Sequence, residues 1–249
     1  MRLALPKGAA VYDLSGKFGA PLDEAVALLR TARPHAARLG ISFHVGSQCL
    51  EPAAYARAMA LAAEAIANCG VPIDIVDVGG GFPVSYPDMS PPPLGDYLAA
   101  IEAVAAELPQ NIRLWAEPGR ALVAGGGSVV VQVQLRRGDT LFVNDGIYGN
   151  LSDAGALGFR FPARRICLGG PEDREEAVAD FALFGPTCDS ADQMKGPFRL
   201  PADMREGDWI ELGQLGAYGA CLRTGFNGFG KVDLVEVVDP PMLSTPGYQ

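Results

Sequence analysis

The sequence has little positive charge, and it lacks long apolar runs. Its 249 residues contain 20 Lys and Arg against 29 Asp and Glu, which gives a net charge of −9. Nucleic acids and anionic membranes bind clustered Lys and Arg, so this balance argues against both as partners. No apolar run approaches the roughly 20 residues of a membrane span, and no signal peptide is visible. The apolar fraction of 49% predicts a folded chain with a packed core.

Paired cysteine motifs are also missing. The five cysteines are odd in number and none are spaced as CxxC: Cys49, Cys69, Cys167, Cys188 and Cys221. This usage fits a reducing cytoplasm better than a disulfide framework or a zinc site. We therefore predict a cytoplasmic protein that has no metal ion.

The first half of the chain alternates strand-like and helix-like segments. A short apolar run at 2–5 directly follows Met1, so the chain begins abruptly in strand-like sequence. Helical periodicity extends over 22–39, where Pro34 kinks or divides the helix. The further expected strands are 41–45, 73–78 and 112–117, and the further expected helices are 52–68 and 94–108. Strands that alternate with helices predict a parallel sheet with helical crossovers.

After Arg120 the segments are β-like. Residues 128–135 and 140–145 predict a hairpin across Arg137-Gly138-Asp139. Later β-like runs are 164–169, 179–185, 208–213 and 231–238. We place the domain boundary in the glycine-rich joint, so that 1–124 is a partial β/α barrel and 125–249 is a β domain. A complete (β/α)₈ barrel needs about 250 residues, so the first domain has room for about four strands.

Three polar clusters each follow an expected strand: HVGSQ (44–48), GGGFP (79–83) and EPGR (117–120). In parallel β/α folds the carboxyl ends of the strands form the rim of the active site. The residues alone leave two interpretations of each cluster. The glycines can hold an anion or form a tight turn, Glu117 and Arg120 can bind a ligand or form a surface ion pair, and His44 can line the rim or lie in the core.

Three further motifs lie in the β domain: GPTCDSAD (185–192), GAY (216–218) and FNGF (226–229). In order and spacing, the six motifs resemble the fold-type-III pyridoxal-phosphate-dependent decarboxylases of the ornithine, diaminopimelate and arginine class, and most of all ornithine decarboxylase. The resemblance implies the C-terminal half of an alanine-racemase-like (β/α)₈ barrel followed by a β-sandwich or barrel domain. It also implies pyridoxal 5′-phosphate as cofactor and a homodimer with shared active sites.

The resemblance further implies decarboxylation of a basic L-amino acid, ornithine to putrescine, in polyamine biosynthesis. His44 would stack on the pyridine ring, and Glu117 would keep the ring nitrogen protonated, so that the ring accepts the electrons left when CO₂ departs. The remaining cofactor-binding residues implied are Ser47, Gly79, Gly80, Gly81, Gly119, Arg120 and Tyr218.

Cys188 matches the cysteine that reaches the neighbouring subunit's site and protonates the carbanion. Asp189 matches the acid that binds the distal ammonium of the substrate. A small buried thiol and a turn residue are the ordinary alternatives. Tyr148, Asp153 and Phe226 complete the implied substrate site, although Asp153 does not align cleanly with the family's acid. Lys17 matches a position that pairs across the dimer interface with Asp192.

The chain departs from the family at the lysine that forms the internal aldimine. That lysine lies far upstream of the HVGS motif, whereas only Lys7 and Lys17 precede His44 here, and neither lies in the family's lysine motif. We therefore expect an N-terminally truncated fragment with little activity by itself. A diaminopimelate or lysine decarboxylase, a non-catalytic relative that binds other subunits, and a truncated gene model remain alternatives.

Overall fold

The computed structural model describes residues 1–8, 10–167 and 177–245, and the chain divides into two compact units. Unit 1 comprises residues 1–84 and 91–121, and unit 2 comprises residues 85–90 and 122–249. The sequence placed the boundary close by, between residues 124 and 125. It did not indicate that the loop 85–90 packs with the second unit.

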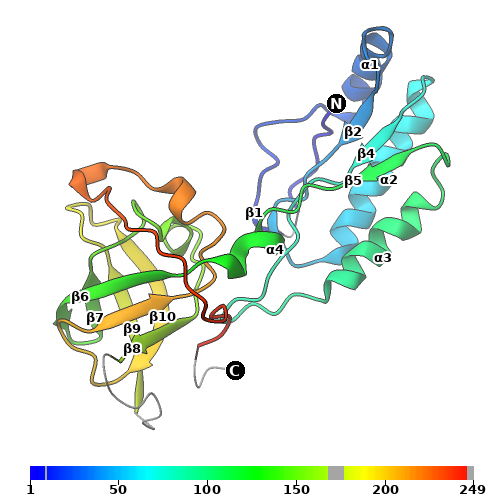
Figure 1. Cartoon of the computed structure of the whole chain (residues 1–249). Helices are drawn as coiled ribbons and strands as arrows, with labels where there is room; N and C mark the ends of the chain where they lie inside the picture. The colour runs from blue at the N-terminus through cyan, green and yellow to red at the C-terminus, as the bar shows by residue number, and fades with distance from the viewer. Residues whose placement is uncertain (9, 168–176, 246–249) are drawn as a thin grey trace. The chain divides into compact units, whose positions relative to one another are not determined.

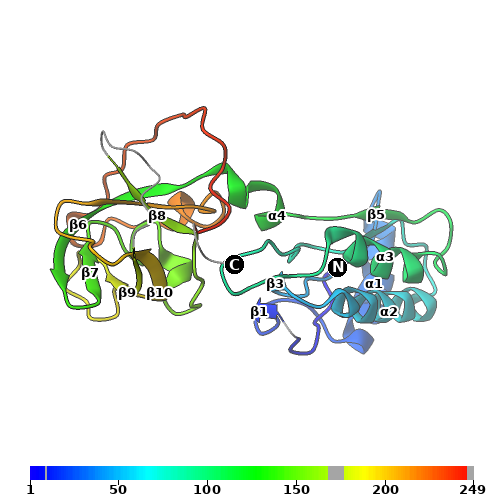
Figure 2. The ribbon, with the colours of Figure 1, turned by 90° about the horizontal axis from the view of Figure 1, so that it is seen from below.

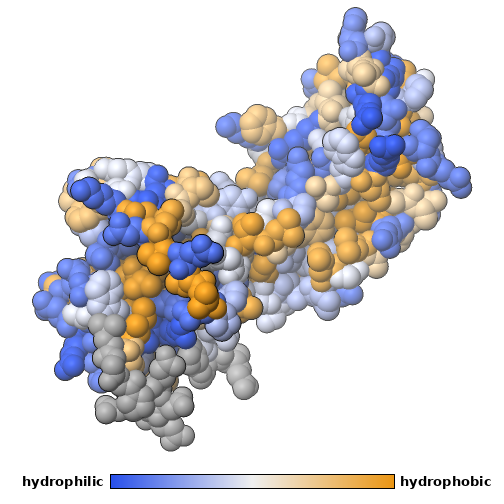
Figure 3. All heavy atoms as spheres, viewed as in Figure 1, coloured by the Kyte–Doolittle hydropathy of each residue, from blue (hydrophilic) through white to orange (hydrophobic). Residues whose placement is uncertain are grey.

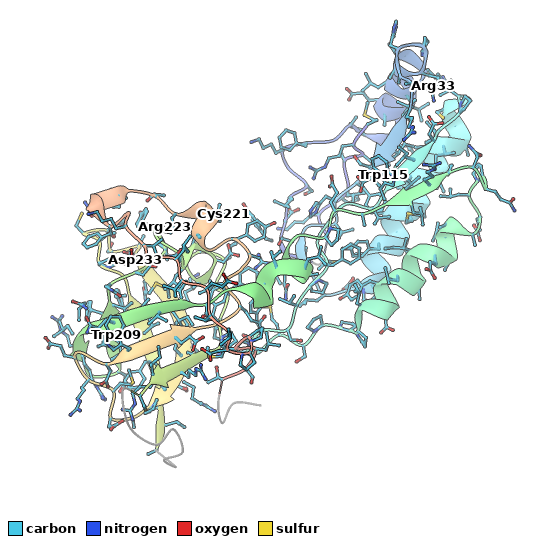
Figure 4. All side chains as sticks on the ribbon, viewed as in Figure 1. Arg33, Trp115, Trp209, Cys221, Arg223 and Asp233 are labelled. Carbon is cyan, nitrogen blue, oxygen red and sulfur yellow. The ribbon has the colours of Figure 1, made fainter. Side chains whose placement is uncertain are left out.

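A three-stranded parallel sheet forms the centre of unit 1 (Figure 1). Its strands are β2 (Gly40–Ser42), β4 (Ile75–Asp77) and β5 (Arg113–Trp115), in the order β2-β4-β5. Ser42 lies opposite Asp77, and Asp77 lies opposite Trp115. β5 is an edge strand whose residues are exposed, including Trp115, which is labelled in Figure 4. The predicted parallel arrangement is therefore confirmed.

Three helices accompany this sheet: α1 (Leu22–Ala32), α2 (Pro52–Cys69) and α3 (Leu94–Ala105). α2 begins with Pro52, is rich in alanine and ends at Gly70, which has the left-handed conformation (φ 65°) common at helix ends. The predicted helix 22–39 was too long. α1 ends at Ala32 and the 3₁₀ turn η1 (Arg33–His35) follows, because Pro34 has no N–H with which to continue the helical hydrogen bonds.

Figure 2 shows α2 and α3 side by side along one face of the sheet. The core between them contains the fully buried Ile41, Val76, Ala62 and Tyr97. A separate antiparallel pair is formed by β1 (Ala10–Tyr12) and β3 (Ser47–Cys49), which the sequence did not predict. The apolar start of the chain lies beside β2, where the Leu3 amide donates to the Ser42 carbonyl at 2.8 Å.

Unit 2 contains a mixed six-stranded sheet in the order β10-β9-β7-β6-β11-β8. β7 and β9 are parallel, and β10 also contacts β8, so the sheet curls into a half-barrel. The strands are β6 (Val129–Arg137), β7 (Thr140–Val143), β8 (Ala163–Ile166), β9 (Val178–Phe184), β10 (Gln193–Pro201) and β11 (Trp209–Leu212). The short helical turn α4 (Arg120–Val123) begins in unit 1, and those within unit 2 are η2 (Ala124–Gly126), η3 (Ser152–Ala154), η4 (Ala220–Leu222) and η5 (Phe226–Gly228). The predicted β6–β7 hairpin and the predicted β domain are confirmed.

In unit 2, one strand was missed and one prediction was wrong. β10 was not expected, because it contains Gly196-Pro197, a pair that usually interrupts a strand. Residues 231–238 were expected to be β-like, but they form no strand in the described structure. Their apolar side chains are exposed, up to 101% for Val238, and Figure 3 shows apolar atoms gathered where this segment runs. Of the expected strand 164–169, residues 168 and 169 lie outside the described residues.

Within the described ranges, no helix is both long enough and apolar enough to cross a membrane. Nor do three or more His, Cys, Asp or Glu side chains gather there as a metal-binding group. All five cysteines are free thiols, of which Cys49 and Cys69 are buried.

Candidate functional site

The register of the parallel sheet brings the three polar clusters of unit 1 to one edge. His44, Gly79 and Glu117 each lie two residues beyond the paired ends of β2, β4 and β5. The Glu117 amide donates to the Gly79 carbonyl at 2.8 Å, so the hydrogen-bonded ladder continues past the strands. We call this edge the rim. It is the place where ligands bind in open parallel sheets.

His44 presents a neutral ring at the rim. Its Nδ1 accepts a hydrogen bond from the Gly46 amide at 3.0 Å, which assigns the ring proton to Nε2. Burial, and then the nearby charge of Arg2, lower the pKa of His44. Nε2 lies so near Gly80 that a Cβ there would be 3.2 Å from it. An uncharged imidazole beside a glycine backbone offers a flat surface to an aromatic ligand.

The glycine turn 79–81 requires glycine for both shape and space. Gly79 and Gly81 have φ angles of 68° and 100°, which disfavour other residues. A Cβ on Gly79 would lie 2.1 Å from the Phe43 carbonyl oxygen, and one on Gly81 would lie 2.2 Å from that of Gly46. The Gly79 amide donates to Asp77 Oδ1 at 2.9 Å, so this glycine contributes shape, and its N–H is engaged within the turn.

A buried guanidinium and a hydroxyl lie together in unit 1. Arg120 is 5% exposed, and its Nη2 lies 3.5 Å from Ser47 Oγ, at hydrogen-bond range. Ser47 is itself buried in β3. A guanidinium and a hydroxyl offer several donors to a phosphate, and Arg suits this task because its donors form a rigid planar fork. The pair is therefore a candidate anion site.

Sequence reasoning missed two buried tyrosines, whose hydroxyls bind backbone carbonyls next to the rim. The hydroxyl of buried Tyr55 donates to the Gly80 carbonyl at 2.9 Å, and its ring stacks on Phe82 at 4.8 Å. Tyr97 donates to the Cys49 carbonyl at 3.0 Å, and burial raises the pKa of Tyr97 to about 12. Both tyrosines lie on helices, at positions that read only as core in the sequence.

The side chain of Gln48 fixes the end of the glycine loop. Its amide accepts from the Val84 N–H at 3.1 Å and donates to the Val84 carbonyl. Gln48 is fully buried, with a φ of 57°. Glu117, by contrast, is exposed, as is Gly119 before Arg120. The glycine loop is therefore held by hydrogen bonds to buried side chains, while the carboxylate of Glu117 is accessible.

In unit 2, Cys188 and Asp189 line a pocket of about 540 Å³. Its apolar walls include Phe142, Phe184 and Phe229, and the first two rings lie 5.5 Å apart. The thiol of Cys188 is exposed. The pocket therefore combines a thiol and a carboxylate with an aromatic lining.

A hydrogen bond from the Tyr148 hydroxyl orients the Asp189 carboxylate. This bond, and a second from the Ala191 amide at 2.9 Å, lower the pKa of Asp189. The same contact raises the pKa of Tyr148. The Tyr148 ring lies 4.6 Å from that of Phe226. Asp189 is thus anionic near neutral pH and suited to a cationic group.

Asp192 organises the loops around this pocket. It is 2% exposed, and its carboxylate accepts from the Ile147 amide at 2.8 Å, the Thr187 amide at 3.1 Å and the Thr187 hydroxyl at 2.8 Å. Lys17 is exposed, with its ammonium 5.1 Å from the Phe18 ring centroid. The intersubunit pair of Lys17 and Asp192 stays a prediction, and the observed partners of Asp192 belong to its own unit.

Two other expected site residues lie apart from the pocket. Asp153 is buried in η3 and does not line the pocket of Cys188 and Asp189. Tyr218 is 41% exposed with a φ of 58°, and its carbonyl accepts from Ser152 Oγ at 3.3 Å. Their roles toward substrate and phosphate stay predictions.

The fold and rim fit a cofactor that carries both an aromatic ring and a phosphate. Residues 2–124 match the family model of the pyridoxal-dependent decarboxylase, pyridoxal binding domain. Lysine/ornithine decarboxylase of Selenomonas ruminantium is 32% identical over 97% of this chain and 61% of its own length. Antizyme inhibitor 2 of Xenopus laevis is 29% identical, with 92% of this chain and 54% of the relative covered.

The crystal structure of the Paramecium bursaria Chlorella virus arginine decarboxylase has a TM-score of 0.78 at 30% identity. The likeness covers 92% of this chain and 63% of that one. The chain belongs to the fold-type-III pyridoxal-phosphate-dependent decarboxylase family. It spans 54–61% of the length of the two curated relatives.

The glycine turn gives a first prediction. Gly79→Ala should lower the free energy of unfolding by about 1–3 kcal/mol more than Gly70→Ala does. The reason is that the new Cβ at position 79 would meet the Phe43 backbone, whereas a Cβ at position 70 would meet no atom within 4 Å. Both positions have φ near 65°, so the matched control removes the conformational cost of about 1–2 kcal/mol. Urea unfolding measures the difference. Equal losses of stability in the two variants would contradict the close approach of Gly79 to the Phe43 backbone.

His44 gives a second prediction, for pH. Because the folded-state pKa of His44 is lowered, its neutral form stabilises the fold fully above the unfolded value of 6.5, and this stability is lost as pH falls below it. The free energy of unfolding should therefore decrease below pH 6.5 more steeply in wild type than in His44→Gln. His35, the other histidine, is present in both proteins. Parallel pH curves would contradict the burial of the imidazole.

Proposed function

We propose that this chain is the cofactor- and substrate-binding part of a pyridoxal-phosphate-dependent decarboxylase that converts L-ornithine to putrescine. The observation that carries the proposal is the rim of unit 1. There the sheet register places a neutral imidazole, a glycine turn and an exposed carboxylate after three neighbouring strands. The Arg120–Ser47 pair in the same unit adds donors for a phosphate.

Four residues of unit 1 have a proposed task toward the cofactor. Arg120 and Ser47 bind the phosphate, His44 packs against the ring, and Glu117 holds a proton on the ring nitrogen. When bound, pyridoxal phosphate supplies an electron-accepting ring for the bond to the departing carboxylate. A neutral His44 suits this arrangement, since a second positive charge would oppose a protonated ring.

The proposed tasks of unit 2 concern the substrate. The anionic Asp189 binds the distal ammonium, and Tyr148 fixes its orientation. Cys188 delivers a proton to the carbon that loses CO₂. The aromatic pocket walls accommodate the aliphatic chain between the two charged ends.

The choice of ornithine rests on the CDSAD and FNGF motifs, which resemble the ornithine decarboxylase branch. The similar proteins include a lysine/ornithine decarboxylase and an arginine decarboxylase, at about 30% identity. A lysine or diaminopimelate decarboxylase is therefore the alternative within the same chemistry. The homodimer with shared sites and the cytoplasmic location also belong to the proposal.

A second candidate is a non-catalytic, decarboxylase-like protein that binds other subunits. One observation favours it: the likeness to antizyme inhibitor 2 of Xenopus laevis. The hydrogen-bonded acid at Asp189 favours the first candidate, because subunit binding alone does not require an oriented carboxylate in a pocket.

The third prediction tests substrate binding. With pyridoxal phosphate present, putrescine should bind more tightly than cadaverine, agmatine or butylamine, which lacks the second ammonium. Asp189→Asn should weaken putrescine binding about tenfold or more, because hydrogen bonds to a charged group contribute about 1.5–3 kcal/mol. Isothermal titration calorimetry gives the affinities.

Ser190→Ala is the matched control, since Ser190 lines the same pocket without a carboxylate. Equal affinity for putrescine and butylamine would reject Asp189 as the ammonium site.

The chain alone should release little or no CO₂ from carboxyl-labelled L-ornithine, since it lacks the family's lysine motif. Turnover near the ordinary enzymatic rate of about 10 s⁻¹ would contradict that expectation.

A further inference from the structure

The segment 224–227 contacts the loops that carry Tyr148 and Cys188. The amide and the hydroxyl of Thr224 both donate to the Tyr148 carbonyl, at 2.9 and 3.1 Å. The Phe226 ring lies against that of Tyr148. One short segment, remote in sequence, therefore holds the residue that orients Asp189.

Asn227 makes the contact to the second loop. Its Oδ1 accepts a hydrogen bond from the Cys188 amide at 3.1 Å. Asn227 has φ 53° and ψ 17°, the left-handed conformation that asparagine and glycine adopt most readily. The position thus requires both a left-handed backbone and a side-chain acceptor, and asparagine supplies both.

Neighbouring amides of the Cys188 loop are held by side chains from different places. The Thr187 amide donates to Asp192, which lies buried within the loop region. The Cys188 amide donates to Asn227, which comes from the segment near the C-terminal end of unit 2. Loss of the Asn227 side chain would remove the hydrogen bond of the Cys188 amide, while the Thr187 amide would keep its bond to Asp192.

We propose that Asn227 is a positioning residue that fixes the Cys188–Asp189 loop. It acts on the pocket through the Cys188 backbone, while Phe226 and Thr224 act through Tyr148. Together these contacts set where the thiol and the carboxylate lie on the pocket wall. The importance of this for catalysis rests on the function proposed above, but the positioning itself can be tested without substrate.

The fourth prediction separates the acceptor from the backbone at this position. Asn227→Gly keeps the left-handed conformation and removes the acceptor, whereas Asn227→Asp keeps an acceptor. Amide hydrogen exchange resolved by NMR should show the Cys188 amide exchanging about fivefold or more faster in Asn227→Gly, and close to the wild-type rate in Asn227→Asp. The Thr187 amide should be unchanged in both variants.

Thiol alkylation gives a second measurement on the same proteins. Iodoacetamide should modify Cys188 at a different rate in Asn227→Gly. Cys167 and Cys221 are exposed thiols that serve as internal controls, and Cys221 is labelled in Figure 4. Their rates should stay constant.

Unchanged exchange of the Cys188 amide in Asn227→Gly would overturn the proposal. Equal acceleration in both variants would overturn it as well, because the acceptor would then be irrelevant. General unfolding would accelerate the Thr187 amide together with that of Cys188, and this would also count against a local role. If putrescine fails to bind wild type while the Cys188 amide responds as expected, the proposed substrate fails and the positioning role stands.

Discussion

The parallel register of β2, β4 and β5 determines where the polar groups of unit 1 can lie. Ser42, Asp77 and Trp115 lie opposite one another, so the residues two positions later share one edge. The close approach of the loops then requires glycine at Gly79 and Gly81, where any Cβ would meet a carbonyl oxygen. Tyr55 holds the same turn from the core through a hydrogen bond. The chemistry of the rim thus depends on backbone packing as much as on side chains.

A buried carboxylate has the corresponding role in unit 2. Asp192 joins the loop before Tyr148 to the loop before Cys188, because donors from both bind its two oxygens. Gly146 and Gly185 leave room for it, since a Cβ at either position would lie about 2.2 Å or less from a carboxylate oxygen. Burial of a charge is costly unless it is hydrogen-bonded, so the Asp192 carboxylate requires the donors that surround it. The partly exposed Asp189 can then serve a ligand.

Local signals in the sequence predicted much of this architecture. Pro52 and Gly70 marked the ends of α2, and each polar cluster followed an apolar strand. β10 was missed because Gly196-Pro197 resembles a loop, and 231–238 was misassigned because β propensity alone does not provide a pairing strand. The roles of Tyr55, Asp192 and Asn227 depend on contacts between residues distant in sequence. Only the fold brings those residues together.

The central claim is that unit 1 recognises a phosphate attached to an aromatic ring. Pyridoxamine 5′-phosphate and pyridoxamine test it directly, because neither forms an imine with lysine and they differ only in the phosphate. Equilibrium dialysis should show the phosphorylated compound binding at least about tenfold more tightly to wild type, and this preference should largely disappear in Arg120→Met. Equal affinity of wild type for the two compounds would contradict the account.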